Sequence, residues 1–173
     1  MSPDPTGKET GRSSFPVSVI LERRPPLDDR WVDHVWSAAG VTVGRRDAGN
    51  DGRPTLVRER DGVAHYMVNG LQVTLFPDEC ESYYHNMMTA TPRCYVVVHR
   101  EEADAMPEPF LVSMSFDEAH AYLEGEDEIF AVDVPPELYR WTEAFVIANY
   151  FPEKKTKRKL KDWTRSEDEG RPS

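Results

Sequence analysis

Alternating apolar and polar positions predict β-strands in the first third of the chain. Residues 15–23 alternate and are rich in Val and Ile, and Pro25 and Pro26 then end the strand because proline cannot donate to a sheet ladder. Residues 31–43 predict a second strand, and Ala39-Gly40 within it indicates a bulge. Residues 45–54 carry Gly, Asn and Asp, so they predict a surface loop.

The middle of the chain predicts antiparallel hairpins. Strands are expected over 56–60, 65–68 and 72–76, joined by Asp61-Gly62 and Asn69-Gly70, because Asn or Asp followed by Gly favours two-residue hairpin turns. Further strands are expected over 94–100, 110–114 and 129–134.

Two segments in the middle of the chain predict short helices, one of which could instead be an irregular crossover. Residues 78–88 form either a short helix N-capped by Asp78 or an irregular crossover. Ser115 and Glu118 spell a capping box for a helix over 116–124 that Gly125 ends. Its inward face is expected to hold Ala119, Tyr122 and Leu123.

The strongest helix pattern follows Pro135-Pro136, because proline fits the first helical turn. Its inward positions are expected to be Leu138, Trp141, Phe145 and Ala148. The patterns together predict an α+β fold: a mostly antiparallel meander sheet of roughly seven or eight strands, packed by two or three helices.

Length and composition favour one domain. The chain has 173 residues, of which 39% are hydrophobic, which suits a single core. Residues 1–14 are expected to be a disordered N-terminal segment, residues 15–151 the domain, and residues 152–173 a charged C-terminal tail. No apolar run is long enough for a membrane span or a secretory signal, so a cytoplasmic protein without membrane contact is expected.

Charge is unevenly distributed along the chain. Residues 153–162 hold six basic and two acidic side chains, a net +4, which leaves −14 for the rest of a chain whose total is −10. An acidic body binds nucleic acid poorly because phosphate contacts dominate such affinity, so nucleic acid is an unexpected partner. The basic tail either docks on an acidic partner or nucleic acid, or is a solvated end.

The sequence offers no strong catalytic motif. It has no nucleophile elbow, no Walker loop and no glycine-rich dinucleotide fingerprint, and the acidic run 124–128 is typical of a solvated loop. No catalytic residue and no cofactor are predicted, and the sequence favours a protein that is not an enzyme.

A metal site has one weak candidate. Cys80, His85, Cys94 and His99 repeat a Cys-x4-His spacing, but Cys94 and His99 in one strand point to opposite faces. Unpaired cysteines, with neither a disulfide nor a zinc ion, are the expected state. No metal ligand is predicted.

The charged end of the first strand is the best candidate for a binding surface, because Arg and Trp are enriched among residues that carry binding energy. The alternative is that the tryptophans are core residues and the arginines pair with local acids. With the tail, the predicted partner-binding residues are Glu22, Arg23, Arg24, Asp28, Arg30, Trp31, Lys154, Lys155, Lys157, Arg158 and Lys159.

The order of these motifs resembles a bacterial family known as a domain of unknown function, over about residues 15–161. The likeness rests on residues 16–24, Arg30-Trp31, Trp36, the strand 95–100, the strand and helix of 110–123, and the ending 151–161. Genes of that family often neighbour those for molybdenum-dependent formate dehydrogenases and their accessory factors. The resemblance implies this context and no mechanism.

Three functions are compatible with these observations. The first is an accessory protein that binds a formate dehydrogenase subunit or one of its maturation factors. The second is a small-ligand or cofactor-handling protein with a pocket where the Leu138 helix meets the sheet, lined by His34, Tyr95 and His99. The third is nucleic-acid binding through the basic tail.

Overall fold

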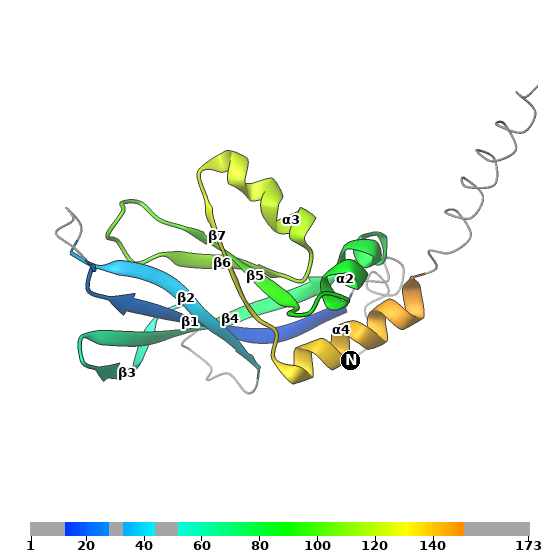
Figure 1. Ribbon diagram of the computed structural model, residues 1–173, viewed down its shortest axis with the longest axis horizontal. Helices are drawn as coiled ribbons and strands as arrows, with labels where there is room; N and C mark the ends of the chain where they lie inside the picture. Colours follow the sequence, from blue (N-terminus) through cyan, green and yellow to red (C-terminus); the bar gives the residue numbers. More distant parts are fainter. Residues whose placement is uncertain (1–12, 28–32, 44–51, 151–173) are drawn as a thin grey trace, which may run out of the picture.

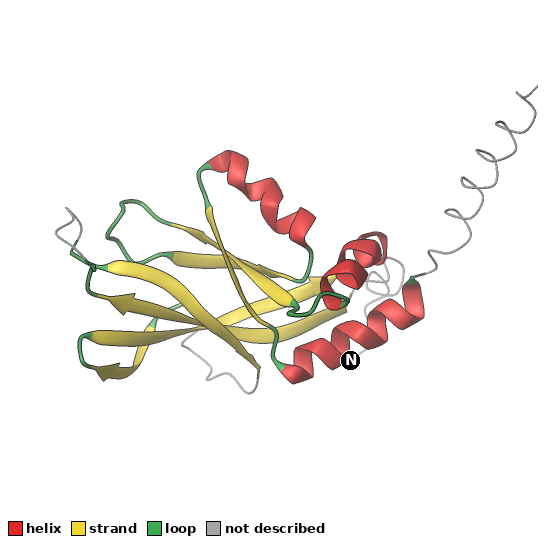
Figure 2. Ribbon diagram, in the orientation of Figure 1, coloured by secondary structure: helices red, strands yellow, loops and turns green. Residues whose placement is uncertain are grey.

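The computed structural model describes residues 13–27, 33–43 and 52–150. Within them, seven strands form one mixed, mostly antiparallel sheet and three α-helices pack against it, so the predicted α+β class is confirmed. Helices α2 and α4 lie together at one end of the sheet, and α3 lies beside the strands β5 to β7 (Figures 1 and 2).

The first two strands form the predicted bulged pair. β1 (Ser13–Arg24) runs antiparallel to β2 (Val35–Val43). Ile20 pairs with Gly40 and Leu21 with Ala38, so Ala39 is the extra residue of a bulge, as the interruption at Ala39-Gly40 predicted. β1 begins at Ser13, so residues 13 and 14 belong to the sheet.

The next hairpin is confirmed at its turn. β3 (Thr55–Arg60) and β4 (Val63–Leu75) are joined by Asp61 and Gly62, with φ of 54° and 82°. Both central residues therefore adopt the positive φ that a type I′ turn requires.

The second predicted hairpin, at Asn69-Gly70, is wrong because β4 passes straight through it. Opposite β1, Val17 pairs with Leu71 and Val19 with Val68, so β4 contains one extra residue and Gly70 takes a φ of 91°. The same Asn-Gly chemistry serves a bulge here, because β1 pairs with both halves of β4.

The sheet order is β2-β1-β4-β6-β5-β7, with β3 also paired to β4. The later strands are β5 (Arg93–His99), β6 (Glu108–Ser113) and β7 (Glu128–Asp133). β6 is parallel to β4, at Val73 and Val112, because the chain passes through α2 and then returns along β5, which is antiparallel to β6. β2 and β7 approach each other, so the sheet is nearly closed.

The crossover is helical but is not capped as expected. A 3₁₀ turn, η1 (Pro77–Glu79), leads into α2 (Cys80–Met87), and the Asp78 side chain makes no cap hydrogen bond. Instead, the Phe76 backbone N–H donates to the hydroxyl of buried Tyr83 at 2.9 Å. Pro77 occupies the first turn and so displaces the expected cap position.

Helix α3 (Phe116–His120) begins with half of the predicted capping box: the Ser115 hydroxyl accepts from the Glu118 backbone N–H at 3.0 Å, but the Ser115 backbone N–H donates to the Ser113 hydroxyl and not to Glu118. A 3₁₀ turn, η2 (Ala121–Gly125), then follows. The predicted inward face is correct for Ala119 but wrong for Tyr122 and Leu123, which are 40% and 49% exposed. The tighter 3₁₀ turn changes the periodicity and turns both side chains outward.

Helix α4 (Pro136–Asn149) starts at the predicted prolines. Leu138, Thr142, Phe145 and Val146 are buried against the sheet and α2. Trp141 is half-buried against Phe15, with ring centroids 5.0 Å apart, whereas Ala148 is exposed, contrary to prediction. The buried stripe follows the four-residue spacing from 138 to 142 and 146, which leaves position 148 on the outer side.

Candidate protein-binding site

The charged end of β1 is organised around Glu22, on one face of the strand. Oε1 of Glu22 lies 3.0 Å from Nε2 of His65, and Oε2 accepts from Nε of Arg24 at 2.8 Å. The hydrogen bond from His65 lowers the pKa of Glu22 below its ordinary value, with Arg24 adding to the effect and burial opposing it. Glu22 is therefore an ionised carboxylate that fixes two neighbouring side chains.

Arg23 points to the opposite face, as alternation along a strand requires. Its Nη1 donates to the Tyr66 hydroxyl at 3.2 Å, and its Nη2 lies 3.3 Å from a carboxylate oxygen of Glu59. Its guanidinium carbon is 5.7 Å from the centre of the Tyr66 ring. The three predicted charged residues of β1 therefore occupy two faces, and each makes a local ion pair.

A hollow of about 490 Å³ lies where β1 ends and β2 begins; we call it the hairpin-end hollow. It also borders on the end of β5 and the start of β7, and its lining is Arg24, Pro25, Pro26, Leu27, His34, Val35, Trp36, Arg100, Ala103 and Glu128. Leu27 is 97% exposed and Val35 is 40% exposed. The hollow therefore offers apolar side chains to solvent beside cationic ones.

The floor of this hollow is held by polar contacts. The Trp36 indole N–H donates to the Asp104 carbonyl at 3.2 Å, which agrees with the interpretation of Trp36 as a core residue, since it is buried. Arg100 donates from Nη1 to the Ala103 carbonyl at 2.8 Å. Its Nε lies 2.8 Å from Glu128 Oε1 as an ion pair without a directed hydrogen bond.

Of the three predicted partner-binding residues that the structure describes, Glu22, Arg23 and Arg24, only Arg24 lines this hollow, and it donates a hydrogen bond to Glu22. Asp28, Arg30, Trp31, Lys154, Lys155, Lys157, Arg158 and Lys159 lie outside the described residues. Sequence analysis missed Arg100 and Glu128, because they reach the hollow only through the sheet order that places β5 and β7 opposite β2.

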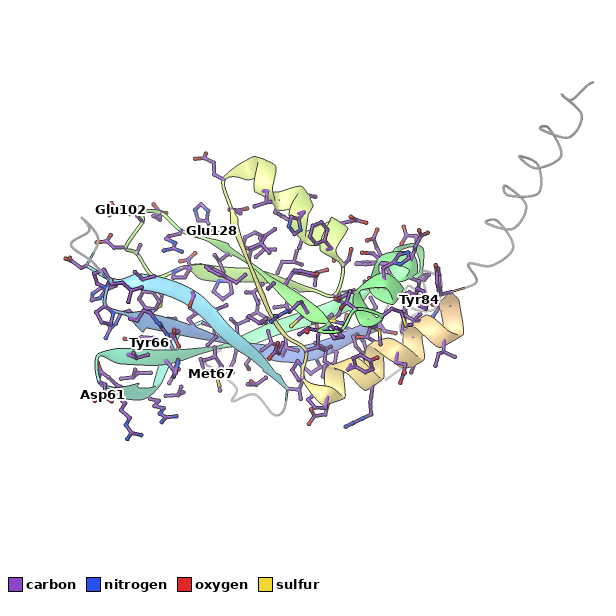
Figure 3. All side chains as sticks on the ribbon, viewed as in Figure 1. Asp61, Tyr66, Met67, Tyr84, Glu102 and Glu128 are labelled. Atoms are coloured by element: carbon purple, nitrogen blue, oxygen red, sulfur yellow. The ribbon has the colours of Figure 1, made fainter. Side chains whose placement is uncertain are left out.

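A second hollow, of about 310 Å³, lies between α2 and α4; we call it the helix groove. Its lining is Tyr84, Met87, Met88, Tyr139, Glu143, Val146, Ile147 and Tyr150. Met88 is 66% exposed and Ile147 is 73% exposed. Figure 3 shows Tyr84 at this end of the molecule, where α2 meets α4. The Met87-Met88 pair was the available sequence signal, because methionines are over-used at adaptable binding surfaces.

In the described part of the chain, the three residues predicted for the pocket of the second function lie at different hollows. His34 lines the hairpin-end hollow, His99 lines a separate hollow with Met106 and Phe110, and Tyr95 lines a third with Phe116. His99 also lies 3.2 Å from a carboxylate oxygen of Asp127. The structure therefore does not bring these three side chains together in one hollow.

A buried serine and glutamate network joins α2 to α3. The Ser115 hydroxyl donates to Glu79 Oε1 at 2.8 Å and lies 3.0 Å from the Ser82 hydroxyl. Glu118 accepts from the Ser113 hydroxyl, and burial together with nearby Glu79 raises the pKa of Glu118 above its ordinary value. Because these serines donate to carboxylates and Ser115 is fully buried, they position the helices.

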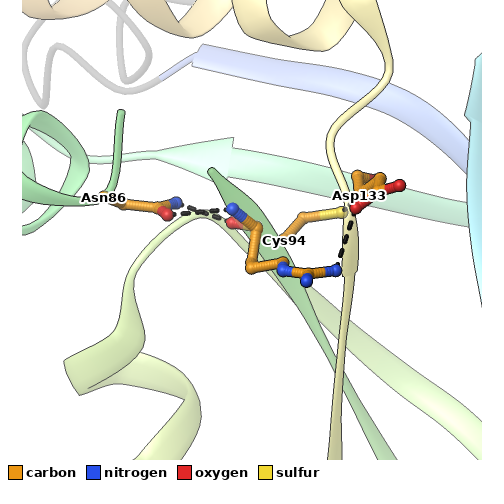
Figure 4. Close-up of polar contacts among 4 residues, drawn as sticks. Asn86, Cys94 and Asp133 are labelled. Carbon is orange, nitrogen blue, oxygen red and sulfur yellow. Dashed lines mark hydrogen bonds and ion pairs between the residues drawn. The ribbon is translucent and has the colours of Figure 1, made fainter. Parts of the chain in front are cut away.

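The two cysteines are buried and unpaired. Burial raises the pKa of both thiols, that of Cys94 to about 12. Figure 4 shows the Cys94 thiol directed at the Asp133 carbonyl, 3.6 Å away. His85 is exposed beside Glu81, and within residues 13–27, 33–43 and 52–150 no group of three or more His, Cys, Asp or Glu is placed to hold a metal ion.

A comparison with models of known families tests the resemblance to a domain of unknown function. A family model described as "Protein of unknown function (DUF3305)" matches residues 16–159. The chain belongs to this family. The match runs from β1 through α4 and includes both hollows as well as the tail up to Lys159.

Neither the curated proteins nor the solved structures include a significant match to this member of the DUF3305 family. None of the helices in its described part is long and apolar enough to cross a membrane.

Proposed function

We propose that this protein is a non-catalytic accessory protein of the bacterial cytoplasm that works by binding another protein through the hairpin-end hollow. The observation that carries the proposal is Leu27, which is almost fully exposed directly after two prolines and beside the exposed Val35. Prolines fix the backbone in advance, so the entropy lost when a partner covers Leu27 is small.

The charges around Leu27 suit a protein partner. Arg24 is held by Glu22, and Arg100 by Ala103 and Glu128, so both guanidinium groups are positioned before a partner arrives. An apolar centre with a polar, preorganised rim is the usual anatomy of a specific interface. Arg24 would then give orientation, while Leu27 and Val35 supply the buried apolar area.

We further propose that the partner is a subunit of a molybdenum-dependent formate dehydrogenase or one of its maturation factors. The support is the resemblance to a family whose genes neighbour those of such enzymes. The protein would then take part in maturation or regulation of the enzyme and not in its chemistry.

The test is recovery of partners from the native host with tagged protein. Wild type and a Leu123→Asp variant should recover a formate dehydrogenase subunit or maturation factor, whereas Leu27→Asp should not. Leu123 is a matched control because it is 49% exposed on η2 and does not line the hollow. Equal recovery by all three proteins would contradict the site. Absence of any oxidoreductase component, with unchanged formate dehydrogenase activity in a deletion strain, would overturn the partner.

A second candidate function is small-ligand or cofactor handling, for which we propose the helix groove as the site. Its volume of about 310 Å³ is at the lower end of the range for ligand pockets, and its lining is mostly apolar with one carboxylate, Glu143. A rise in unfolding temperature with molybdopterin, a nucleotide or formate that is lost in Ile147→Asp would favour this function. No rise with any of the three would count against it.

A further inference from the structure

The hairpin-end hollow brings together two arginines from distant parts of the chain. Arg24 is the last residue of β1, and Arg100 directly follows β5. The lining holds these two cations and one carboxylate, Glu128, so its net charge is +1 when His34 is neutral. The whole chain carries −10, so the hollow is a local exception in an acidic protein. A cationic hollow of this kind attracts an anionic group.

Arg100 has hydrogen-bonding capacity that the chain does not use. Its side chain is only 11% exposed, and its Nη1 donates to the Ala103 carbonyl at 2.8 Å. Its Nε is the one buried side-chain nitrogen or oxygen in the described part of the chain that lacks a hydrogen-bond partner, although Glu128 lies close enough for an ion pair. A guanidinium has five N–H donors, so an acceptor from another molecule can complete the set.

Arg24 is held from one side. Its Nε and Nη2 both contact Oε2 of Glu22, at 2.8 and 2.5 Å. Among the described residues, Nη1 of Arg24 has no hydrogen-bond acceptor, and the side chain is about half exposed at the hollow. The planar guanidinium therefore presents its remaining N–H groups in a fixed orientation.

The lining favours a carboxylate side chain over other anions. Glu22 and Glu128 each neutralise part of one guanidinium, so the remaining positive charge suits a monoanion better than a doubly charged phosphate. Backbone N–H groups commonly capture the terminal carboxylate of a peptide, but Pro25 and Pro26 of the lining have no N–H. An Asp or Glu side chain needs only the planar N–H groups of arginine.

The cations lie beside exposed apolar side chains. Arg24 pairs with Val35 across the β1–β2 ladder, and directly opposite residues in such a ladder place their side chains next to each other. Leu27 follows Arg24 after two prolines and also lines the hollow. Both Val35 and Leu27 are exposed. A carboxylate that reaches Arg24 therefore brings its neighbouring residue onto apolar surface.

We infer that the hairpin-end hollow recognises an Asp or Glu side chain of the partner that is flanked by an apolar residue. The carboxylate binds between Arg24 and Arg100, and the apolar side chain packs on Leu27 and Val35. This inference rests on the protein-binding function proposed above, and it makes Arg100 a second orienting residue beside Arg24.

Nuclear magnetic resonance titration of the purified full chain with blocked peptides tests this recognition. The probe acetyl-Ala-Leu-Glu-Leu-Ala-amide should shift the side-chain Nε–H signals of Arg24 and Arg100 saturably. The signal of Arg60 should stay in place, because Arg60 is exposed on β3 outside the hollow. The same peptide with Gln in place of Glu should bind about tenfold more weakly, because a charge-assisted hydrogen bond is lost. Absence of saturation with the Glu peptide, or equal affinities of the two peptides, would overturn the inference.

A third peptide tests the source of the carboxylate. Acetyl-Ala-Leu-Gln-Leu with a free terminal carboxylate should bind as weakly as the Gln peptide, because the prolines of the lining offer no backbone donors. Binding as tight as that of the Glu peptide would assign the hollow to a chain terminus and contradict recognition of a side chain.

An arginine variant shows which protein group recognises the charge. In Arg24→Gln, the preference for the Glu peptide over the Gln peptide should fall from about tenfold to about twofold, whereas Arg60→Gln should keep the full preference. The preference is a ratio of two affinities for one protein, so a general loss of folded protein does not change it. An unchanged preference in Arg24→Gln would contradict the inference.

Partner recovery from the native host separates this inference from the proposed function. Leu27→Asp should lose the partner whether or not a carboxylate is recognised, because it removes the exposed apolar side chain. Loss of the partner in Leu27→Asp together with equal affinities for the Glu and Gln peptides would leave the function standing and refute carboxylate recognition. Full recovery by Leu27→Asp would overturn both, whatever affinities the peptides show.

Discussion

The hairpin-end hollow and the helix groove lie at different parts of the fold, and they differ in how many charged groups surround their exposed apolar side chains. At the hairpin end, Glu22, Arg24 and Arg100 are charged, and each has a partner within the chain. In the groove, Met88 and Ile147 are apolar and are exposed without cover from the described residues. The first surface is preorganised in its charges, and the second has apolar area still available for burial.

This difference indicates that the charges of the hairpin end are suited to orient a partner and that the apolar groove is suited to bind one tightly. Exposed ion pairs contribute little to stability, so the paired charges of the hairpin end are better suited to orient a partner than to hold the fold. Burial of apolar side chains contributes about 25 cal/mol for each Å², so the groove is the stronger source of binding free energy.

The largest expected effect is at Leu138, which is fully buried and holds α4 against the sheet beneath the groove. Leu138→Ala should lower the free energy of unfolding by about 2 to 5 kcal/mol, because the lost burial is accompanied by a cavity. Ile147→Ala, on the exposed side of the same helix, should change it by less than about 0.5 kcal/mol. Urea unfolding followed by circular dichroism measures both. Equal effects would show that α4 is not held by its buried stripe.

The next effect is at Asn86, whose side chain ties α2 to β5 and to the end of β6. It donates to the Arg93 carbonyl at 2.6 Å and accepts from the Arg93 backbone N–H at 3.0 Å (Figure 4). It also donates to the Met114 carbonyl at 3.0 Å. Asn86→Ala should cost about 2 to 3 kcal/mol, because the buried groups left behind lose their partners.

Asn149→Ala is the matched control for Asn86. The Asn149 amide makes one hydrogen bond, to the Phe145 carbonyl at 2.8 Å, near the end of α4 where water replaces it. The Asn149→Ala substitution should lower the free energy of unfolding by less than about 1 kcal/mol. A cost for Asn86→Ala as small as this control would show that α2 does not depend on the network.

Local chemistry in the sequence was enough to predict most elements and their turns. Asp61-Gly62 forms a hairpin turn and Ser115 forms a helix cap, as their residue types predict, because turn and cap preferences depend on neighbouring residues. Asn69-Gly70 did not form the predicted hairpin turn. A hairpin turn and a β-bulge both use a residue with positive φ, and here the pairing of β4 with β1 selects the bulge. The outward orientation of Tyr122 and Leu123 was also missed, because no local sequence signal predicts the 3₁₀ turn that contains them.

The candidate site was only partly predictable. Arg24 was predicted from the composition of one continuous stretch of chain, whereas Trp36 was considered only as a core residue. Arg100 and Glu128 were not predicted, since their place opposite β2 depends on a sheet order in which β5 lies between β6 and β7. The helix groove requires α2 and α4, far apart in sequence, to pack together.

The pH dependence of stability should differ in sign between Glu22 and Glu118. The pKa of Glu22 is lowered in the folded state, mainly by the hydrogen bond to His65, so its stabilisation is present above the unfolded pKa of about 4.3. That stabilisation is lost as the pH falls through the lower folded pKa. Glu22→Gln should therefore show a shallower loss of unfolding free energy than wild type on acidification below pH of about 5.

Glu118 should behave in the opposite way. Burial raises its folded pKa, so its contribution is complete below the unfolded pKa and is lost as the pH rises through the folded value. Glu118→Gln keeps an acceptor for the Ser113 hydroxyl without the buried charge, so it should be more stable than wild type at neutral pH and gain little in acid. Urea titrations across pH measure both variants. Parallel pH profiles would contradict the opposite environments of the two carboxylates.

A small effect on stability is expected at Arg24, together with a clear effect on partner binding. Arg24 is about half exposed and pairs with Glu22, so Arg24→Ala should change the free energy of unfolding by about 0 to 1 kcal/mol. The same substitution should nevertheless reduce partner recovery from the native host, because it removes a positioned cation from the hairpin-end hollow. Arg60→Ala is the control, since Arg60 is exposed on β3 and does not line the hollow. If Arg24→Ala destabilised the fold strongly while leaving recovery intact, the charged end of β1 would be a structural element and the hollow would lose its role in orienting a partner.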